Sequence, residues 1–152
     1  MPAPRSIRIP RTLQSELERE FARRGTGEWS AGVVDLLTEA VRQRRVPGVV
    51  FVDGRTGRRP MVAGTGMDVW ELVAVWRAVG EDAQRFREAT EWLTDTQRAA
   101  ALNYYALYPE EIERRLAVDE AWTPERLQRE LPFASGATHS TPSASAVSDR
   151  ER

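Results

Sequence analysis

The chain lacks several residue types on which protein chemistry often depends. Its 152 residues include no cysteine and no lysine, so all 22 basic residues are arginine. Without cysteine there is no disulfide framework, thiolate metal site or cysteine nucleophile. The single histidine, His139, has no second imidazole to join it, which leaves little material for a zinc site or a serine-histidine-aspartate triad. We therefore expect a protein that is not an enzyme and that holds no metal and no cofactor.

Long hydrophobic runs are also missing. No apolar stretch approaches the roughly 20 residues of a membrane span, and the N-terminal MPAPRSIRIPR has no apolar signal core. With 41% hydrophobic and 30% charged residues, the chain has the composition and length of about one folded domain. We expect a cytoplasmic protein with no membrane contact.

The charge is divided unevenly along the chain, although the net charge is only −1. Residues 1–60 carry 12 arginines against 7 acids, or +5, and residues 61–152 carry 10 arginines against 16 acids, or −6. Such a polarity indicates two modules with different partners. The partner of the first, positively charged module is expected to be anionic. A planar, permanently charged guanidinium suits phosphate or carboxylate.

The first 45 residues have the pattern of one strand and two amphipathic helices. Residues 6–10 (SIRIP) alternate between polar and apolar side chains, which predicts a half-buried strand that ends at Pro10. Thr12 is expected to cap a first helix, and Ser30 a second. The second helix closes with basic residues, which complement the negative end of its dipole. The arginines concerned are Arg42, Arg44 and Arg45.

So short a module cannot bury its apolar faces alone, and without metals or disulfides dimerisation is the remaining way to fold. The run RSIRIPRTLxxxL, a glycine turn and WSxxVVDLLTEAVR resemble the ribbon-helix-helix DNA-binding fold. The resemblance implies that residues 1–45 form a homodimer or higher oligomer, whose paired strands enter the major groove of operator DNA. The fold class expected for the whole chain is mainly α.

The resemblance also implies roles for individual residues. Ser6 and Arg8 would point at base edges, with Arg8 able to bond guanine bidentately. Ser30 would grip a phosphate at the start of the second helix, and Arg5 and Arg11 would add backbone contacts. The alternative is that Arg8 lies on a solvent-exposed strand and binds nothing. The basic end of the second helix would then only complement the helix dipole.

Residues 46–67 have the signals of a short hairpin, with two β-type runs around Asp53-Gly54. Residues 68–118 then read as four short helices, the third capped by Thr94 and the fourth beginning at Pro109. The motifs GRRPMVAGTGMDVWEL and LTDTQRAAALNYYALYPEEI resemble the small helix-turn-helix-like domain of unknown function found in many VapB-type bacterial antitoxins. This resemblance spans about residues 49–116.

The chemistry of this second domain favours protein contacts over DNA contacts. Its expected recognition helix offers one basic residue, Arg98, and residues 61–133 carry 8 arginines against 14 acids. Several aromatic residues could form either a partner face or the core. They are Trp70, Trp76, Trp92, Tyr104, Tyr105 and Tyr108.

Residues 119–133 read as a short amphipathic helix, and residues 134–152 have a composition typical of a disordered tail. In antitoxins of the kind that the chain resembles, a C-terminal arm folds over the toxin. If the toxin resembles a PIN-type ribonuclease, an arginine of the arm would neutralise its acidic metal site. The alternative is that the arm docks on the protein's own core. The candidate partner-binding residues are Trp122, Arg126, Leu127, Arg129 and Leu131.

Together these patterns predict the antitoxin of a type II toxin-antitoxin system. It would bind and inhibit a cognate ribonuclease toxin and autorepress its own operon by binding operator DNA. The alternative is a stand-alone dimeric DNA-binding transcriptional regulator without a toxin partner.

Overall fold

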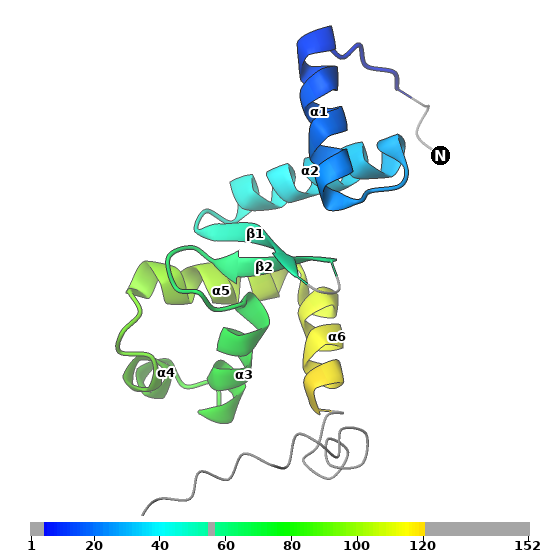
Figure 1. Cartoon of the computed structure of the whole chain (residues 1–152). Helices are drawn as coiled ribbons and strands as arrows, with labels where there is room; N and C mark the ends of the chain where they lie inside the picture. The colour runs from blue at the N-terminus through cyan, green and yellow to red at the C-terminus, as the bar shows by residue number, and fades with distance from the viewer. Residues whose placement is uncertain (1–4, 55–56, 121–152) are drawn as a thin grey trace, which may run out of the picture. The chain divides into compact units, whose positions relative to one another are not determined.

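A computed structural model describes residues 5–54 and 57–120 of the chain (Figure 1). These residues form six helices and one two-stranded sheet, in the order α1, α2, β1, β2, α3, α4, α5, α6. The chain divides into two units, Met1–Glu113 and Arg114–Arg152. In the described ranges no helix is both long enough and apolar enough to cross a bilayer.

Two helices open the chain, α1 (Arg11–Arg24) and α2 (Trp29–Arg45). Pro10 stands at the N-cap of α1, and Gly25 ends the helix in the left-handed conformation, with φ 68°. The ring of Phe21 packs against Gly32, where a Cβ atom would lie 2.7 Å from the Phe21 Cε1 atom. Phe21 is the one buried residue of α1, so the two helices share little core of their own.

The expected ribbon-helix-helix layout is wrong. Residues 5–10 form neither strand nor helix, because a strand exists only where a neighbour accepts its hydrogen bonds. In the described residues the two strands pair with each other, and no strand pairs with residues 5–10. The helix starts also differ from the expectation. Pro10 and Glu28 occupy the N-cap positions in place of Thr12 and Ser30, and neither makes a side-chain capping bond.

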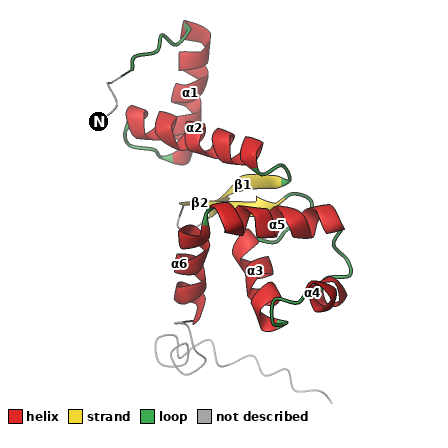
Figure 2. Cartoon of the chain, turned by 180° about the vertical axis from the view of Figure 1, so that it is seen from behind, coloured by secondary structure: helices red, strands yellow, loops and turns green. Residues whose placement is uncertain are grey.

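The expected hairpin is confirmed. Strand β1 (Val49–Gly54) pairs antiparallel with β2 (Gly57–Val62), in a register that sets Val49 opposite Val62 and Gly54 opposite Gly57. The hairpin lies between α2 on one side and α5 on the other, as seen from behind in Figure 2. It therefore joins the first two helices to the later ones.

The remaining helices are α3 (Val69–Ala78), α4 (Ala83–Ala89), α5 (Asp95–Leu107) and α6 (Pro109–Glu120). Thr94 caps α5 as expected, with its hydroxyl accepting from the backbone of Gln97 while the Gln97 side chain accepts from the backbone of Thr94. Helices α3 and α5 pack against each other and on the hairpin. The residues with no exposed surface are Val62, Val69, Leu72, Val73, Ala101 and Tyr104. The mainly helical class is thus as expected.

The aromatic residues that the sequence singled out differ in their exposure. Tyr104 is fully buried, whereas Trp92 is 57% exposed in the segment between α4 and α5. Trp76 lies edge-on to the buried Phe86, with ring centroids 5.3 Å apart. The other three, Trp70, Tyr105 and Tyr108, are partly exposed.

Candidate nucleic-acid interface

Three arginines at the start of the chain are free to bind an anion. Arg5 and Arg8 lie on the extended segment before α1, and Arg11 is the first residue of that helix. All three side chains are exposed, and none forms a salt bridge with any described residue. Since residues 5–11 contain no acid, the segment carries a charge of +3.

The two serines expected beside these arginines lie in different places. Ser6 is exposed on the same extended segment as Arg5 and Arg8. Ser30 is exposed in the first turn of α2, and the Trp29 ring that precedes it lies edge-on to Phe21 at 6.4 Å between centroids. A phosphate-binding role for Ser30 stays a prediction.

Further along α1 the cations are already engaged. Arg23 and Arg24 both bond to Glu20, at 2.7 Å and 2.6 Å. The hydrogen bond from Arg23 is the largest cause that lowers the pKa of Glu20 to about 2. The guanidinium groups at this end of the helix are therefore less available to bind a phosphate than the sequence suggests.

A carboxylate of α2 joins the helical pair to the hairpin. Glu39 is only 9% exposed and accepts two hydrogen bonds from the Arg58 guanidinium, at 2.8 Å and 2.9 Å. Arg58 also donates to Asp53 and to the carbonyl oxygen of Phe51. The bonds to Glu39 raise the pKa of Arg58, so this cation serves the fold and is not available for a ligand.

A second junction ties the end of α2 to the start of α6. Arg42 donates to the Tyr104 hydroxyl at 2.9 Å and to Glu111, and its guanidinium lies 4.5 Å from the centre of the Tyr108 ring. Burial raises the pKa of Tyr104, so its hydroxyl keeps its proton and can donate to Glu111. Arg42 is thus a structural residue as well.

Helix α5 presents no cation to a nucleic acid. Arg98 is 8% exposed and donates to the Thr90 hydroxyl and the Thr90 carbonyl oxygen, both at 3.0 Å. It also bonds to Asp95 at 3.2 Å. Because α5 carries no other basic residue, the helix expected to resemble a recognition helix has no charge for phosphate.

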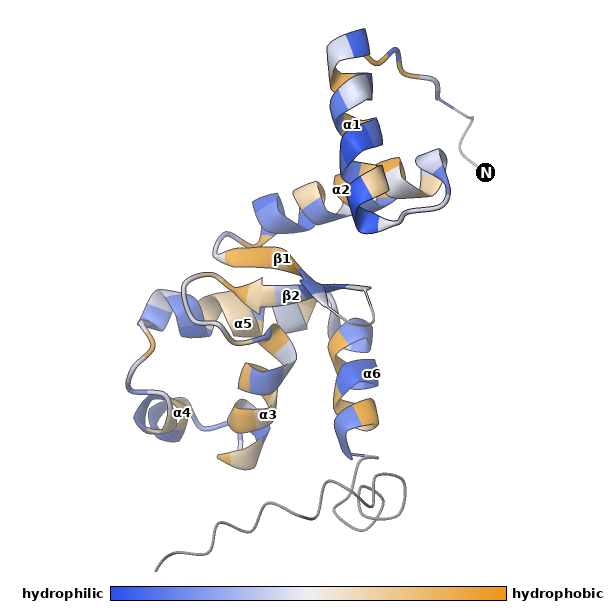
Figure 3. Ribbon diagram, in the orientation of Figure 1, coloured by the Kyte–Doolittle hydropathy of each residue, from blue (hydrophilic) through white to orange (hydrophobic). Residues whose placement is uncertain are grey.

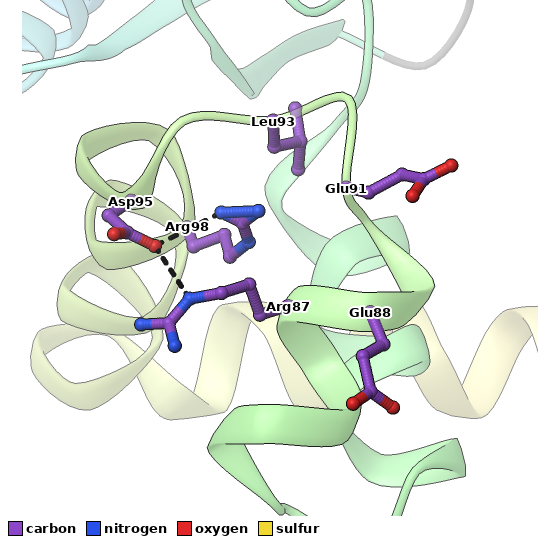
Figure 4. A pocket seen from close by; sticks show the side chains of 6 residues that line it. All are labelled: Arg87, Glu88, Glu91, Leu93, Asp95 and Arg98. Atoms are coloured by element: carbon purple, nitrogen blue, oxygen red, sulfur yellow. Dashed lines mark hydrogen bonds and ion pairs between the residues drawn. The ribbon is translucent and has the colours of Figure 1, made fainter.

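A shallow hollow of about 440 Å³ lies beside this arginine, lined by Arg87, Glu88, Glu91, Leu93, Asp95 and Arg98 (Figure 4). Arg87 and Arg98 both point toward Asp95 and bond to its carboxylate. These bonds lower the pKa of Asp95, and the hydrogen bond from Arg87 is the largest cause. The hollow has three acids and two neutralised cations, so it does not suit an anionic ligand.

The two junctions could not be found from local sequence patterns. Glu39 and Arg58 are 19 residues apart, and Arg42 and Glu111 are 69 residues apart. No spacing rule links residues so distant, whereas pairs such as Glu20 and Arg24 follow from helical spacing. The predicted partner-binding residues from 122 to 131 lie outside the described residues.

The chain was compared with protein-family models, with curated proteins and with solved structures, and no match was found in any of the three.

Proposed function

We propose that this chain is a DNA-binding antitoxin, a non-enzymatic protein that binds operator DNA through its N-terminal arginines and inhibits a ribonuclease toxin through residues 119–133. The observation that carries the DNA-binding half is the state of Arg5, Arg8 and Arg11. All three are exposed and have no ion-pair partner in the described residues. They can bind phosphate without first breaking an internal salt bridge.

The distribution of free and paired cations supports this placement. Of the nine arginines in residues 5–45, only Arg23, Arg24 and Arg42 form salt bridges with other residues that the structure describes. Of the six arginines in residues 57–113, all but Arg85 do so. In the described residues the arginines without a salt bridge are thus more numerous in residues 5–45 than in residues 57–113, which favours attraction of a polyanion to the N-terminal region.

The toxin-binding half is supported by the acidic balance of residues 61–152 and by the resemblance of residues 49–116 to the antitoxin-associated domain. In this proposal Trp122, Leu127 and Leu131 fill an apolar groove on the toxin. Arg126 or Arg129 neutralises the acidic cluster that holds its metal ions.

The DNA-binding half is tested by the salt dependence of binding to the operator and to a random duplex. Log affinity falls linearly with log salt, and each lost phosphate contact makes this negative slope less steep by about 0.9. We expect Arg8→Ala to reduce the steepness of the slope by about one on both duplexes. The triple variant Arg5→Ala, Arg8→Ala and Arg11→Ala should reduce it by about three.

The matched control is Arg85→Ala, because Arg85 is also exposed and also lacks a salt bridge within the described residues. Its slope should equal that of the parent chain. An unchanged slope in the triple variant would show that these arginines do not contact DNA. If Arg8→Ala weakened binding to the operator but not to the random duplex, Arg8 would contact a base.

The toxin-binding half is tested by pull-down of the protein encoded beside this chain. A chain truncated after Val118 should lose that partner and keep its DNA affinity. Undiminished capture would refute the role of the arm. The absence of any captured neighbour with spaced acidic residues would favour a regulator without a toxin.

A further inference from the structure

The segment before α1 is a single stretch of chain that little of the described structure covers. Residues 5–10 form neither helix nor strand, and every one of them except Ile9 is exposed. Ile7 is 71% exposed although its side chain is large and apolar. Figure 3 shows both apolar and hydrophilic residues along this segment, which leads away from the first turn of α1. The segment is therefore accessible to a ligand along its length.

The backbone and the charges of the segment suit a polyanion that it can follow. Pro10 joins it to α1 with φ −58° and ψ 146°, the values of an extended chain. Arg5 and Arg8 are separated by at most about 10 Å of extended chain, which is the length of about three base pairs. Neither arginine forms a salt bridge with a described residue, and the segment contains no acid.

The widths of the two DNA grooves decide where such a segment fits. The major groove is about 12 Å wide and admits a helix or a two-stranded ribbon, whereas the minor groove is about 6 Å wide. A single extended chain is narrow enough for the minor groove, since neighbouring strands of a sheet lie only about 4.8 Å apart. A ribbon for the major groove would need a second strand beside residues 5–10, and no described strand pairs with them.

We propose that residues 5–10 lie in the minor groove of A·T-rich DNA, with Arg5 and Arg8 donating hydrogen bonds to base edges. This inference rests on the proposed function, because it names the groove and the class of DNA sequence that the N-terminal arginines bind. Runs of A·T pairs have a narrow minor groove with an enhanced negative potential, which attracts arginine side chains.

The hydrogen-bond groups of the groove favour the same sequences. An A·T pair presents only acceptors there, adenine N3 and thymine O2, whereas a G·C pair adds the N2 amino donor of guanine. A guanidinium has donors and no acceptor, so it matches an A·T pair and meets a competing donor at a G·C pair. Arg11 lies in α1, which is too wide for the minor groove, and binds a phosphate at its edge.

The affinity of the full-length chain for three duplexes of equal length, at one salt concentration, tests the groove. The first carries a central A·T run of about six base pairs, twice the span of residues 5–8. The second has G·C pairs in mixed order at these positions, and the third has inosine·cytosine pairs there. Inosine lacks the N2 amino group, so its pair has the major groove of G·C and the minor-groove acceptors of A·T. We expect the A·T and inosine duplexes to bind about tenfold more tightly than the G·C duplex.

Variants test whether the arginines of the segment carry this preference. In the double variant Arg5→Ala and Arg8→Ala, the ratio of the affinities for the A·T and G·C duplexes should fall toward one. Arg11→Ala is the matched control, because Arg11 is also exposed and also lacks a salt bridge with a described residue. It should weaken binding to both duplexes by a similar factor and keep their ratio.

Several outcomes would overturn the inference. Equal affinity for all three duplexes would show that the arginines bind only the phosphate backbone. If the inosine duplex bound as weakly as the G·C duplex, the contact would lie in the major groove. An unchanged ratio in the double variant would assign the preference to other residues. In each of these cases the chain still binds DNA and the proposed function stands, whereas a chain that binds none of the duplexes overturns both.

Discussion

The helical pair of residues 5–45 and the hairpin with its helices in residues 46–113 are built from similar residues but use them in opposite ways. In the later region most large apolar side chains are buried or half-buried, with Trp92 and Leu107 as exposed exceptions, and most arginines pair with carboxylates. In the helical pair six large hydrophobic side chains stay exposed. They are Ile7, Leu13, Trp29, Val34, Leu37 and Val41.

The difference follows from how many elements each region contributes to one core. The hairpin, α3, α4, α5 and the start of α6 enclose a space that Leu72, Phe86 and Tyr104 fill. Two helices alone enclose almost nothing, so only Phe21 is buried in α1. The later region therefore buries most of the core, and the helical pair leaves large apolar side chains exposed.

The largest expected effect on the free energy of unfolding comes from truncating a buried leucine of the later region, compared with an exposed leucine of the helical pair. Leu72→Ala removes a fully buried side chain and should lower the free energy of unfolding by about 3 kcal/mol. Leu13→Ala, at a residue 44% exposed, should cost about 1 kcal/mol or less. Chemical denaturation measures both losses, and equal losses would contradict the division into a region with a buried core and a helical pair with little core.

A smaller effect is expected at the junction between the two regions. Glu39→Ala leaves the partly buried Arg58 without its main partner and should cost about 2 kcal/mol in the same denaturation experiment. Asp35→Ala is the control, because Asp35 is an exposed acid of the same helix with no salt bridge to a described residue. If the two variants unfold alike, Glu39 does not hold the regions together.

The smallest effect is the loss of stability in acid. Four carboxyl groups have pKa values below their ordinary values because arginine or tyrosine side chains donate hydrogen bonds to them. They are Glu20, Asp53, Asp95 and Glu113. Their contribution is therefore complete above the ordinary carboxyl pKa. It is lost as the pH falls through the lowered values, toward about 2 for Glu20.

Denaturation midpoints at pH 7 and pH 3 measure this dependence. The parent chain should be less stable at pH 3, and Glu20→Gln should reduce the difference between the two midpoints. Glu16→Gln should leave it unchanged, since Glu16 is an exposed acid of α1 that forms no salt bridge with a described residue. A Glu20→Gln chain with the parent's pH dependence would show that the bonds to Arg23 and Arg24 contribute nothing.

Much of the later region was predictable because its signals are local. The Asp53-Gly54 turn signal predicted the hairpin, although both residues lie in β1 and pair with Arg58 and Gly57. Thr94 with Gln97 formed the cap expected at the start of α5. The helices of the first region were also predictable from the spacing of Leu13, Leu17 and Phe21. Their first residues were not, because Pro10 and Glu28 took the N-cap positions.

The strand expected at residues 6–10 failed for a non-local reason. Alternation shows that a segment suits a strand, but hydrogen-bond partners decide whether it becomes one. The same limit applied to the candidate site. The sequence singled out Arg5, Arg8 and Arg11, yet only the coordinates showed that they form no salt bridge with a described residue, while Arg58 and Arg98 do.

By itself the sequence determined the charge division, the absence of cysteine chemistry, the mainly helical class and the positions of most helices, since composition and periodicity act over a few residues. Only the tertiary structure decided which apolar faces are covered and which arginines are neutralised. Both depend on residues distant in the chain, such as Glu39 with Arg58 and Arg42 with Glu111, that meet when the helices pack around the hairpin.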